Sequence, residues 1–162
     1  MDQNDVKMSV KVSLVLNEIL DMMLYDENRN QRKLPFRLIS KLVRNKAMLE
    51  KDEKEFYAYK SLLISRYGEE KEDGYKITDP EKLKLYEKDI MDALDTEVSH
   101  NVLKIKLEEL DKMTAELDIA KEAIIILQQF LVDDEKFIND LNTNIIFSRE
   151  NNNVWLDWQQ KT

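Results

Sequence analysis

The spacing of apolar residues at the start of the chain predicts a short strand followed by a helix. Apolar and polar residues alternate over residues 6–12, which is the two-residue period of a strand with one buried face. From Leu14 onward, apolar residues become nearly continuous as far as Leu24. Ser13 precedes this run, and serine is a favoured N-cap, so we expect a helix over about residues 14–25.

A long uninterrupted helix is predicted between Pro35 and Tyr67. Proline is tolerated in a first helical turn and Gly68 supplies a stop, so we expect about 32 residues spanning roughly 48 Å. Apolar residues recur every seven positions along it, at Leu42, Leu49, Phe56 and Leu63. The two candidate series for a second stripe are mostly polar: Asn45, Asp52 and Tyr59, or Lys46, Glu53 and Lys60. We therefore expect this helix to bury a narrow stripe against one neighbouring helix and to be solvated elsewhere.

A second helix is predicted to fold back on the long one. Asp79-Pro80 is typical of a helix start, because Asp is a favoured cap and Pro suits the first helical position. Over residues 80–95 the helix has one apolar face, made of Leu83, Tyr86, Ile90 and Leu94. The charged segment before it contains Asp73-Gly74, which favours a turn. We expect an antiparallel hairpin on the C-terminal half of the long helix.

Beyond this hairpin, the pattern predicts a second strand and two further helices. Residues 97–107 end in an apolar–polar alternation at Leu103, Ile105 and Leu107. This alternation predicts a short strand that pairs with residues 6–12 at the base of the hairpin. Apolar residues at helical spacing follow over residues 117–131, with Thr114 as the cap, and a last helix ends near the asparagines at 151–153.

The predicted fold is mainly α, with a long helical hairpin, C-terminal helices and a small two-stranded β element at the hairpin base. The chain has 162 residues, which suits one domain with a real core. Its two glycines and two prolines favour long helices with few tight turns. We predict a single helical domain over residues 1–150 and a tryptophan-containing C-terminal tail over residues 151–162.

Residue patterns of known chemistry are scarce in this sequence. There is no cysteine, which excludes disulfides and thiolate metal sites, and two glycines cannot form a glycine-rich phosphate loop. His100 is the only histidine, so a histidine metal site or a nucleophilic triad lacks its usual partners. The acidic loop Glu69–Gly74 does not fit a calcium loop, because Lys71 would take a ligand position and Pro80 the place of the terminal glutamate. We predict a protein that is not an enzyme and that uses no metal and no cofactor.

Charge is distributed very unevenly along the chain. Between Arg29 and Lys51, eight basic residues and one acid give a net charge of +7, whereas the whole chain is −8 and the remainder therefore −15. At 100° per residue, five of these cations fall within about 40° of one direction: Lys33, Arg37, Lys41, Arg44 and Lys51. Two interpretations are open. The cations form a solvated face balanced by acids of the same molecule, or they bind an acidic partner.

The C-terminal tail is the second candidate for partner binding. Trp155 and Trp158 lie close together after the run of asparagines. Tryptophan is a favoured anchor at interfaces, and a large exposed apolar side chain is costly unless something covers it. The two tryptophans either fold back to cap the core or dock on a partner.

A set of short motifs resembles a known group of proteins. They are Lys33–Lys46 (KLPFRLISKLVRNK), Arg66–Glu70 (RYGEE), Asp73-Gly74, Ile77–Pro80 (ITDP), Glu97-Val98 and Ile105–Leu110 (IKLEEL). The arrangement resembles small proteins encoded in tailed-phage and prophage genomes, which form a family of unknown function. The resemblance covers about residues 10–112. It implies a phage origin and carries no active-site residue with it.

Together, these features predict a phage-encoded, non-enzymatic protein that acts through protein–protein binding. It would be a virion or assembly component, or an inhibitor of a host defence system, with a host or phage protein or a second copy as its partner. The alternative is a nucleic-acid-associated protein that uses the basic helix face. The acidic start at residues 1–5 predicts no secretory signal, and the longest apolar run, Ala123–Leu127, is too short to cross a membrane. We expect no membrane partner and a location in the host cytoplasm or the virion.

Overall fold

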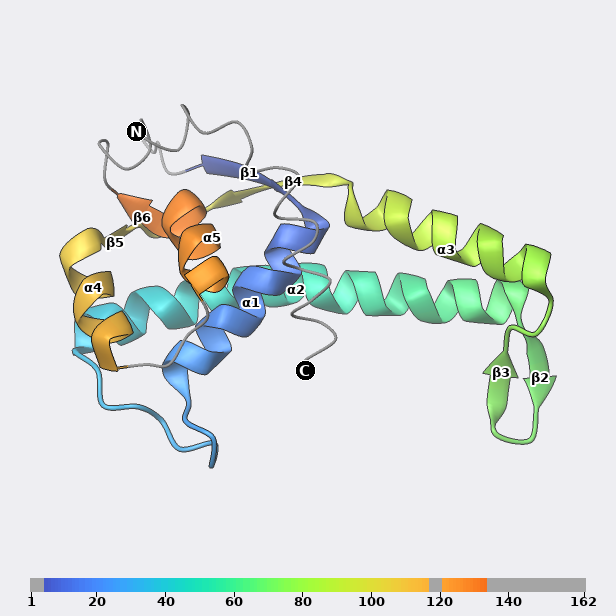
Figure 1. The fold of residues 1–162 in the computed structure, drawn as a ribbon, viewed down its shortest axis with the longest axis horizontal. Coiled ribbons are helices and arrows are strands. Elements are labelled where there is room, and N and C mark those ends of the chain that lie inside the picture. The colour runs from blue at the N-terminus through green and yellow to red at the C-terminus, as the bar shows by residue number, and fades with distance from the viewer. Residues whose placement is uncertain (1–4, 117–120, 134–162) are drawn as a thin grey trace.

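The chain is mainly α-helical, with short two-stranded β elements. The structure is a computed structural model that describes residues 5–116 and 121–133. Its helices are α1 (Val10–Leu24), α2 (Phe36–Tyr67), α3 (Pro80–Leu94), α4 (Leu107–Glu116) and α5 (Lys121–Leu131). Its strands are β1 (Asp5–Ser9), β2 (Glu69–Lys71), β3 (Gly74–Lys76), β4 (Glu97–Asn101), β5 (Ile105–Lys106) and β6 (Val132–Asp133). Figure 1 shows an elongated molecule in which most elements gather into a body at one end of α2, while α3 and the β2–β3 hairpin form an arm at the other.

The core of the body lies around α1. This helix packs against the N-terminal half of α2 on one side and against α5 on another, so its apolar residues are buried nearly all round (Figure 1). The fully buried side chains at the centre include Leu16, Ile19, Leu20, Met23, Leu38, Leu42, Leu49, Ile105, Leu110 and Leu127. Burying a large aliphatic side chain stabilises a fold by roughly 1.5–3 kcal/mol, so this cluster is the main source of stability.

A small antiparallel sheet joins the N-terminus to the base of the hairpin, as the sequence predicted. Strand β1 pairs with β4, and Met8 lies opposite Val98. The partner strand is not the one expected, however. The residues 105–106 within the alternating segment form β5, which pairs in parallel with β6. The alternation reflects the burial of Ile105 in the core and does not determine which strand it pairs with.

The first helix begins earlier than its sequence pattern predicts. The strand ends at Ser9, whose hydroxyl oxygen accepts a hydrogen bond from the Val12 amide at 3.2 Å and caps α1. Ser13, the predicted cap, lies inside the helix and is fully buried. Two serines four residues apart are both suitable caps, and the sheet pairing of β1 decides between them.

The arm is an antiparallel hairpin of α3 on the C-terminal half of α2, which confirms the predicted hairpin (Figure 1). Asp79 caps α3 with its side chain, and Gly68 ends α2, both as predicted. A Cβ at Gly68 would lie 2.5 Å from the Ile64 carbonyl oxygen, so only glycine allows this tight exit. At the end of the arm, the Tyr67 hydroxyl donates a 2.6 Å hydrogen bond to Asp89, and this bond links α2 to α3.

The charged segment after α2 is a β-hairpin and not a simple turn. Strands β2 and β3 are antiparallel, with Glu70 opposite Tyr75. Gly74 has a φ of 112°, a conformation that side-chain-bearing residues rarely adopt, so it allows the tight reversal. The hairpin projects from the outer end of the arm, and all its residues from Glu69 to Lys76 are exposed (Figure 1).

One helix of the body was not predicted. Residues 107–116 form α4, and Thr114, the predicted cap of the next helix, lies inside it. The following helix, α5, begins at Lys121. The predicted last helix and the tail with Trp155 and Trp158 lie outside the described residues. Among the residues that are described, no helix combines the length and the apolar character needed to cross a membrane.

Candidate functional site

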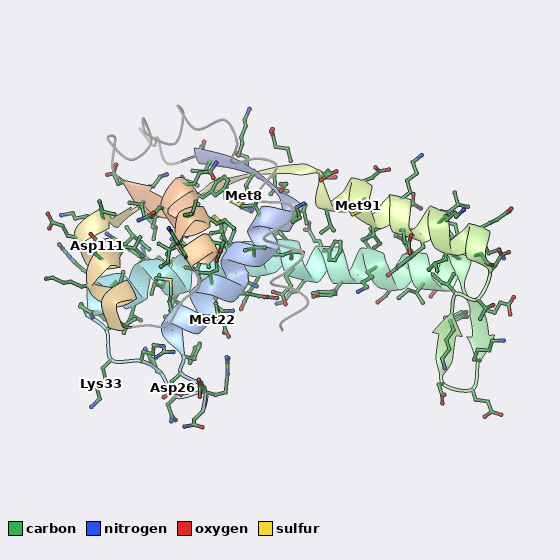
Figure 2. The ribbon with its side chains drawn as sticks, in the orientation of Figure 1. Met8, Met22, Asp26, Lys33, Met91 and Asp111 are labelled. Carbon is green, nitrogen blue, oxygen red and sulfur yellow. The ribbon has the colours of Figure 1, made fainter. Side chains whose placement is uncertain are left out.

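The predicted basic face lies on the N-terminal half of α2 and on the loop that precedes it. Four of its five cations are exposed, and in the described part of the chain none of them has an ion-pair partner: Lys33, Arg37, Arg44 and Lys51. Figure 2 shows the Lys33 side chain extending away from the body. The fifth cation, Lys41, is half-buried and its Nζ lies 3.4 Å from Glu109 Oε1 of α4. We call the four exposed residues the basic face from here on.

The other cations of the basic segment interact with Asp21 and the Met22 carbonyl of α1 and with Glu50 of α2. Arg29 pairs with Asp21 at 2.6 Å, and the Nε of Arg32 donates to the Met22 carbonyl at 3.0 Å. Lys46 lies between two acids, 3.8 Å from Asp21 and in contact with Glu50 of its own helix. These three cations are therefore balanced within the molecule, which is the first of the two interpretations. Binding of an acidic partner concerns only the basic face.

An exposed aromatic residue and a cavity lie beside the basic face. Phe36, the first residue of α2, is 82% exposed, the highest value among the large apolar side chains of the described residues. Next to it, a cavity of about 340 Å³ separates the loop before α2 from α4. Its lining is apolar at Leu34, Pro35 and Leu38, and charged at Lys33 and at Glu108, Glu109 and Lys112 of α4. A partner whose acidic groups pair with the basic face would therefore also contact apolar surface at Phe36 and at the cavity.

Three polar residues that sequence reasoning did not single out form a buried cluster. The Asp52 side chain is 7% exposed, and its Oδ2 accepts a 2.6 Å hydrogen bond from the Ser13 hydroxyl of α1. The same oxygen lies 2.6 Å from Nε2 of His100 in β4. An ionised carboxylate only accepts hydrogen bonds, so both neighbours donate to it. One carboxylate thus holds α1, α2 and β4 together where the arm leaves the body.

The order of residues in this cluster is unsuited to nucleophilic catalysis. In a hydrolase triad the imidazole lies between the hydroxyl and the acid and takes the hydroxyl proton. Here Asp52 lies in the middle, and the Ser13 hydroxyl points its proton at the carboxylate. Ser13 is also fully buried, so no substrate carbonyl can approach it. The geometry supports a packing role for these three residues.

A second buried polar residue of α2 holds the loop between β4 and β5. The Asn45 side chain is almost fully buried, and its Nδ2 donates to the Leu103 carbonyl at 2.9 Å. The Leu103 amide donates back to Asn45 Oδ1 at 2.8 Å. This paired arrangement satisfies both backbone groups of one residue, as a strand partner would. The adjacent Val102 is thereby held in the core.

These residues correct the expectation that α2 buries only a narrow stripe. Leu38, Asn45 and Asp52 are seven residues apart and are all buried beside the apolar series. The second stripe therefore exists, with two polar members that have specific partners on α1, β4 and the loop after β4. The seven-residue spacing was visible in the sequence. Nothing in the sequence identified the partners, which come from segments 39–58 residues away.

Three carboxylates, Glu18, Asp21 and Glu53, lie near one another where α1 packs on α2. Glu18 is half-buried there, and burial together with the nearby Glu53 and Asp21 carboxylates raises its pKa above the ordinary 4.5. On the same side, Tyr57 has a raised pKa because of burial and because Glu53 and Glu18 lie nearby. The ionised form of Glu18 is therefore disfavoured in the folded state, which slightly lowers the free energy of unfolding at neutral pH.

We expect Glu18→Gln to stabilise the protein by about 0.5 kcal/mol at pH 7, a magnitude typical of relieving repulsion between neighbouring like charges. Since the folded state raises the pKa of Glu18 above its unfolded value of 4.5, the penalty is complete above the raised pKa and disappears as the pH falls below 4.5. Urea unfolding of wild type and variant at neutral and acidic pH measures the difference, which should shrink toward acid.

The matched control is Glu27→Gln, which removes an exposed acid from the loop after α1. It should leave stability unchanged to within about 0.5 kcal/mol at both pH values. A Glu18→Gln variant that is less stable than wild type at pH 7, or a difference independent of pH, would contradict the prediction.

No protein-family model, no curated protein and no solved structure matches the chain. Within residues 5–116 and 121–133, no group of three or more histidine, aspartate or glutamate residues is placed to hold a metal ion. Trp155 and Trp158, the other predicted partner-binding residues, lie outside these ranges.

Proposed function

We propose that this chain is a phage-encoded, non-enzymatic protein that acts by binding another protein through its basic face. One observation carries the proposal. Four cations, Lys33 in the loop before α2 and Arg37, Arg44 and Lys51 on one side of α2, are exposed with no acidic partner in the described residues, although the chain as a whole is acidic. By contrast, Arg29 and Lys46 of the same basic segment pair with Asp21 of α1.

The chemistry of this surface favours a protein partner with acidic side chains. Arg37 and Arg44 carry guanidinium groups, which pair with carboxylates in a two-pronged geometry. Phe36 beside them offers an apolar side chain, and arginine and aromatic residues are enriched at protein interfaces. Binding to single-stranded nucleic acid usually uses several aromatic side chains along the cationic groove, whereas this segment has Phe36 alone. The net charge of −8 also repels a long phosphate backbone.

The phage origin rests on the sequence resemblance, and it defines two classes of partner. A virion or assembly component associates with phage proteins or with copies of itself. An inhibitor of a host defence system binds one host protein with fixed stoichiometry. The basic face fits both, and the experiment below separates them.

We expect the double variant Arg37→Glu and Arg44→Glu to lose partner binding by at least about tenfold, because two charge-assisted pairs become repulsive. Tagged wild type and variant are used for affinity capture from lysates of uninfected and infected host cells, and the bound proteins are identified by mass spectrometry. The leading partner is then purified, and its affinity for both chains is measured by calorimetry.

The matched control reverses two exposed cations of α3, Lys82→Glu and Lys84→Glu, and should bind like wild type. A partner present in uninfected lysate indicates the inhibitor class, and one found only after infection indicates the assembly class. If the basic-face variant and the control bind equally, the basic face is not the binding surface. If wild type shifts DNA or RNA in a salt-dependent manner and captures no protein, the nucleic-acid alternative replaces the proposal.

A further inference from the structure

The two ends of the molecule carry opposite charge. At the end of the arm, the β2–β3 hairpin contains four carboxylates and two lysines, a net charge of −2 over residues 69–76. Lys71 lies 3.4 Å from Glu69, and Lys76 lies 3.8 Å from Asp73. The remaining acids, Glu70 and Glu72, have no ion-pair partner among the described residues. We call residues 69–76 the acidic tip.

The opposite end, where α2 begins, is basic. Lys33 and Arg37 are exposed there, and the acids nearest to them in the cavity lining, Glu108 and Glu109, belong to α4. Glu109 already pairs with Lys41. Because α2 has 32 residues, about 48 Å of helix separates this basic end from the acidic tip. Figure 1 shows the two at opposite ends of the long axis, so they cannot meet within one molecule.

Each end also offers an exposed aromatic side chain. Tyr75 on β3 is 48% exposed at the acidic tip, and Phe36 is exposed at the basic end. The cavity of about 340 Å³ beside Phe36 is lined on one side by Leu34, Pro35 and Leu38. An aromatic ring from a partner fits such a lining, while its hydroxyl can reach the charged residues on the α4 side. The ends therefore match in apolar surface as well as in charge.

We propose that a second copy of this chain is the occupant of the basic end, with its acidic tip docked on Lys33, Phe36 and Arg37 and its Tyr75 at the adjacent cavity. The inference rests on the proposed function, and it assigns the partner of the basic face to the assembly class. Glu70 and Glu72 of the docking copy meet Lys33 and Arg37 of the receiving copy. Tyr75 contributes the buried aromatic contact.

This contact joins two different surfaces of the same molecule. A single contact of that kind leaves a free basic end on one copy and a free tip on the other, so further copies can add. Copies therefore add head to tail, and the product is a ring or an open chain whose mass rises with concentration. The smallest such ring is an antiparallel dimer, in which each tip docks on the basic end of the other copy. Exposed charges at the contact make association sensitive to salt, because the distance over which charges attract one another becomes shorter as ionic strength rises.

The test uses two charge-reversed chains of the full sequence. The first reverses the tip, Glu70→Lys and Glu72→Lys, and the second reverses the basic end, Lys33→Glu and Arg37→Glu. Sedimentation velocity at low salt should show wild type growing beyond its monomer mass of 19.3 kDa as concentration rises. Each variant alone should remain at the monomer mass. Mixed together, the two variants should associate again, because every tip once more faces an end of opposite charge.

Restored association in the mixture also shows that both variants are folded. The control reverses three exposed charges in the middle and inner part of α3, Glu87→Lys, Lys88→Glu and Asp92→Lys, and should assemble like wild type. Raising the salt from about 0.05 to 0.5 M should lower the wild-type association constant at least about tenfold. Tyr75→Ser should weaken assembly without any change of charge.

Three results would overturn the inference. They are a wild type that stays monomeric at low salt and high concentration, variants that assemble alone, or variants that fail to assemble when mixed although circular dichroism shows native helix content. None of these results removes the proposed function, because capture of a different protein by the basic face is measured separately. Loss of both readouts would defeat both proposals.

Discussion

Asp52→Ala is expected to lower the free energy of unfolding by about 3–5 kcal/mol, because two hydrogen bonds to a carboxylate are lost and each contributes about 1.5–3 kcal/mol. The substitution leaves the buried Ser13 hydroxyl and the His100 imidazole without their acceptor. It also removes a side chain of α2 that is hydrogen-bonded to both α1 and β4. Urea unfolding followed by far-UV circular dichroism measures the loss.

Two further variants separate the charge from the packing. Asp52→Asn keeps the shape and one acceptor oxygen, so it should cost less than Asp52→Ala. Replacing Ser13 by Ala, Asp52 by Leu and His100 by Leu together removes every polar member of the cluster at once. Because an apolar cluster needs no hydrogen-bond partners, this triple variant should recover most of the loss. A cost below about 1 kcal/mol for Asp52→Ala would show that the cluster is not stabilising.

Asn45→Leu should be the second most damaging single change, with a loss of about 2–4 kcal/mol. Both the amide and the carbonyl of the half-buried Leu103 lose their partner, and an unsatisfied group costs up to about 1–3 kcal/mol when buried. Leucine is more apolar than asparagine and similar in size, so the loss cannot come from a cavity. Urea unfolding gives the magnitude, and hydrogen exchange at Leu103 should become faster.

Asn28→Leu is the matched control, because Asn28 is exposed in the loop after α1. It should change stability by no more than about 0.5 kcal/mol. Equal effects of the two substitutions would mean that the Asn45 amide contributes nothing specific. Unchanged exchange at Leu103 would mean that the loop is held by other contacts.

Local sequence features predicted the helical hairpin well. The Asp79 side chain caps the start of α3. Gly68 ends α2 because it has no side chain to collide with the Ile64 carbonyl. Such effects act within one turn and can be found without knowing the fold. The α4 helix was missed for the opposite reason. Leu103, Ile105 and Leu107 alternate with polar residues, which predicts one strand. Strand β5 ends at Lys106, however, and Leu107 is the first residue of α4, so the alternation continues across the boundary and conceals the start of the helix.

The candidate site was predictable in part. The direction of the basic face follows from helical periodicity alone, and Arg37, Arg44 and Lys51 are exposed as that projection requires. Whether each cation is paired depends on distant segments, and Lys41 is held by Glu109, which lies 68 residues further along the chain. Asn45 and Asp52 were misjudged because a polar residue on a helix is usually solvated, and only tertiary contacts show that both are buried with partners.

The continuity of α2 has a mechanical consequence. Arg37 lies in its first turn and the acidic tip follows its last residue, so one unbroken helix connects the two proposed contact surfaces. In a head-to-tail chain, tension entering at one end reaches the other along the covalent backbone and the helical hydrogen bonds. The packing of α1 and α5 lies outside this path. Such a chain would part at the contacts between copies before any protomer unfolds.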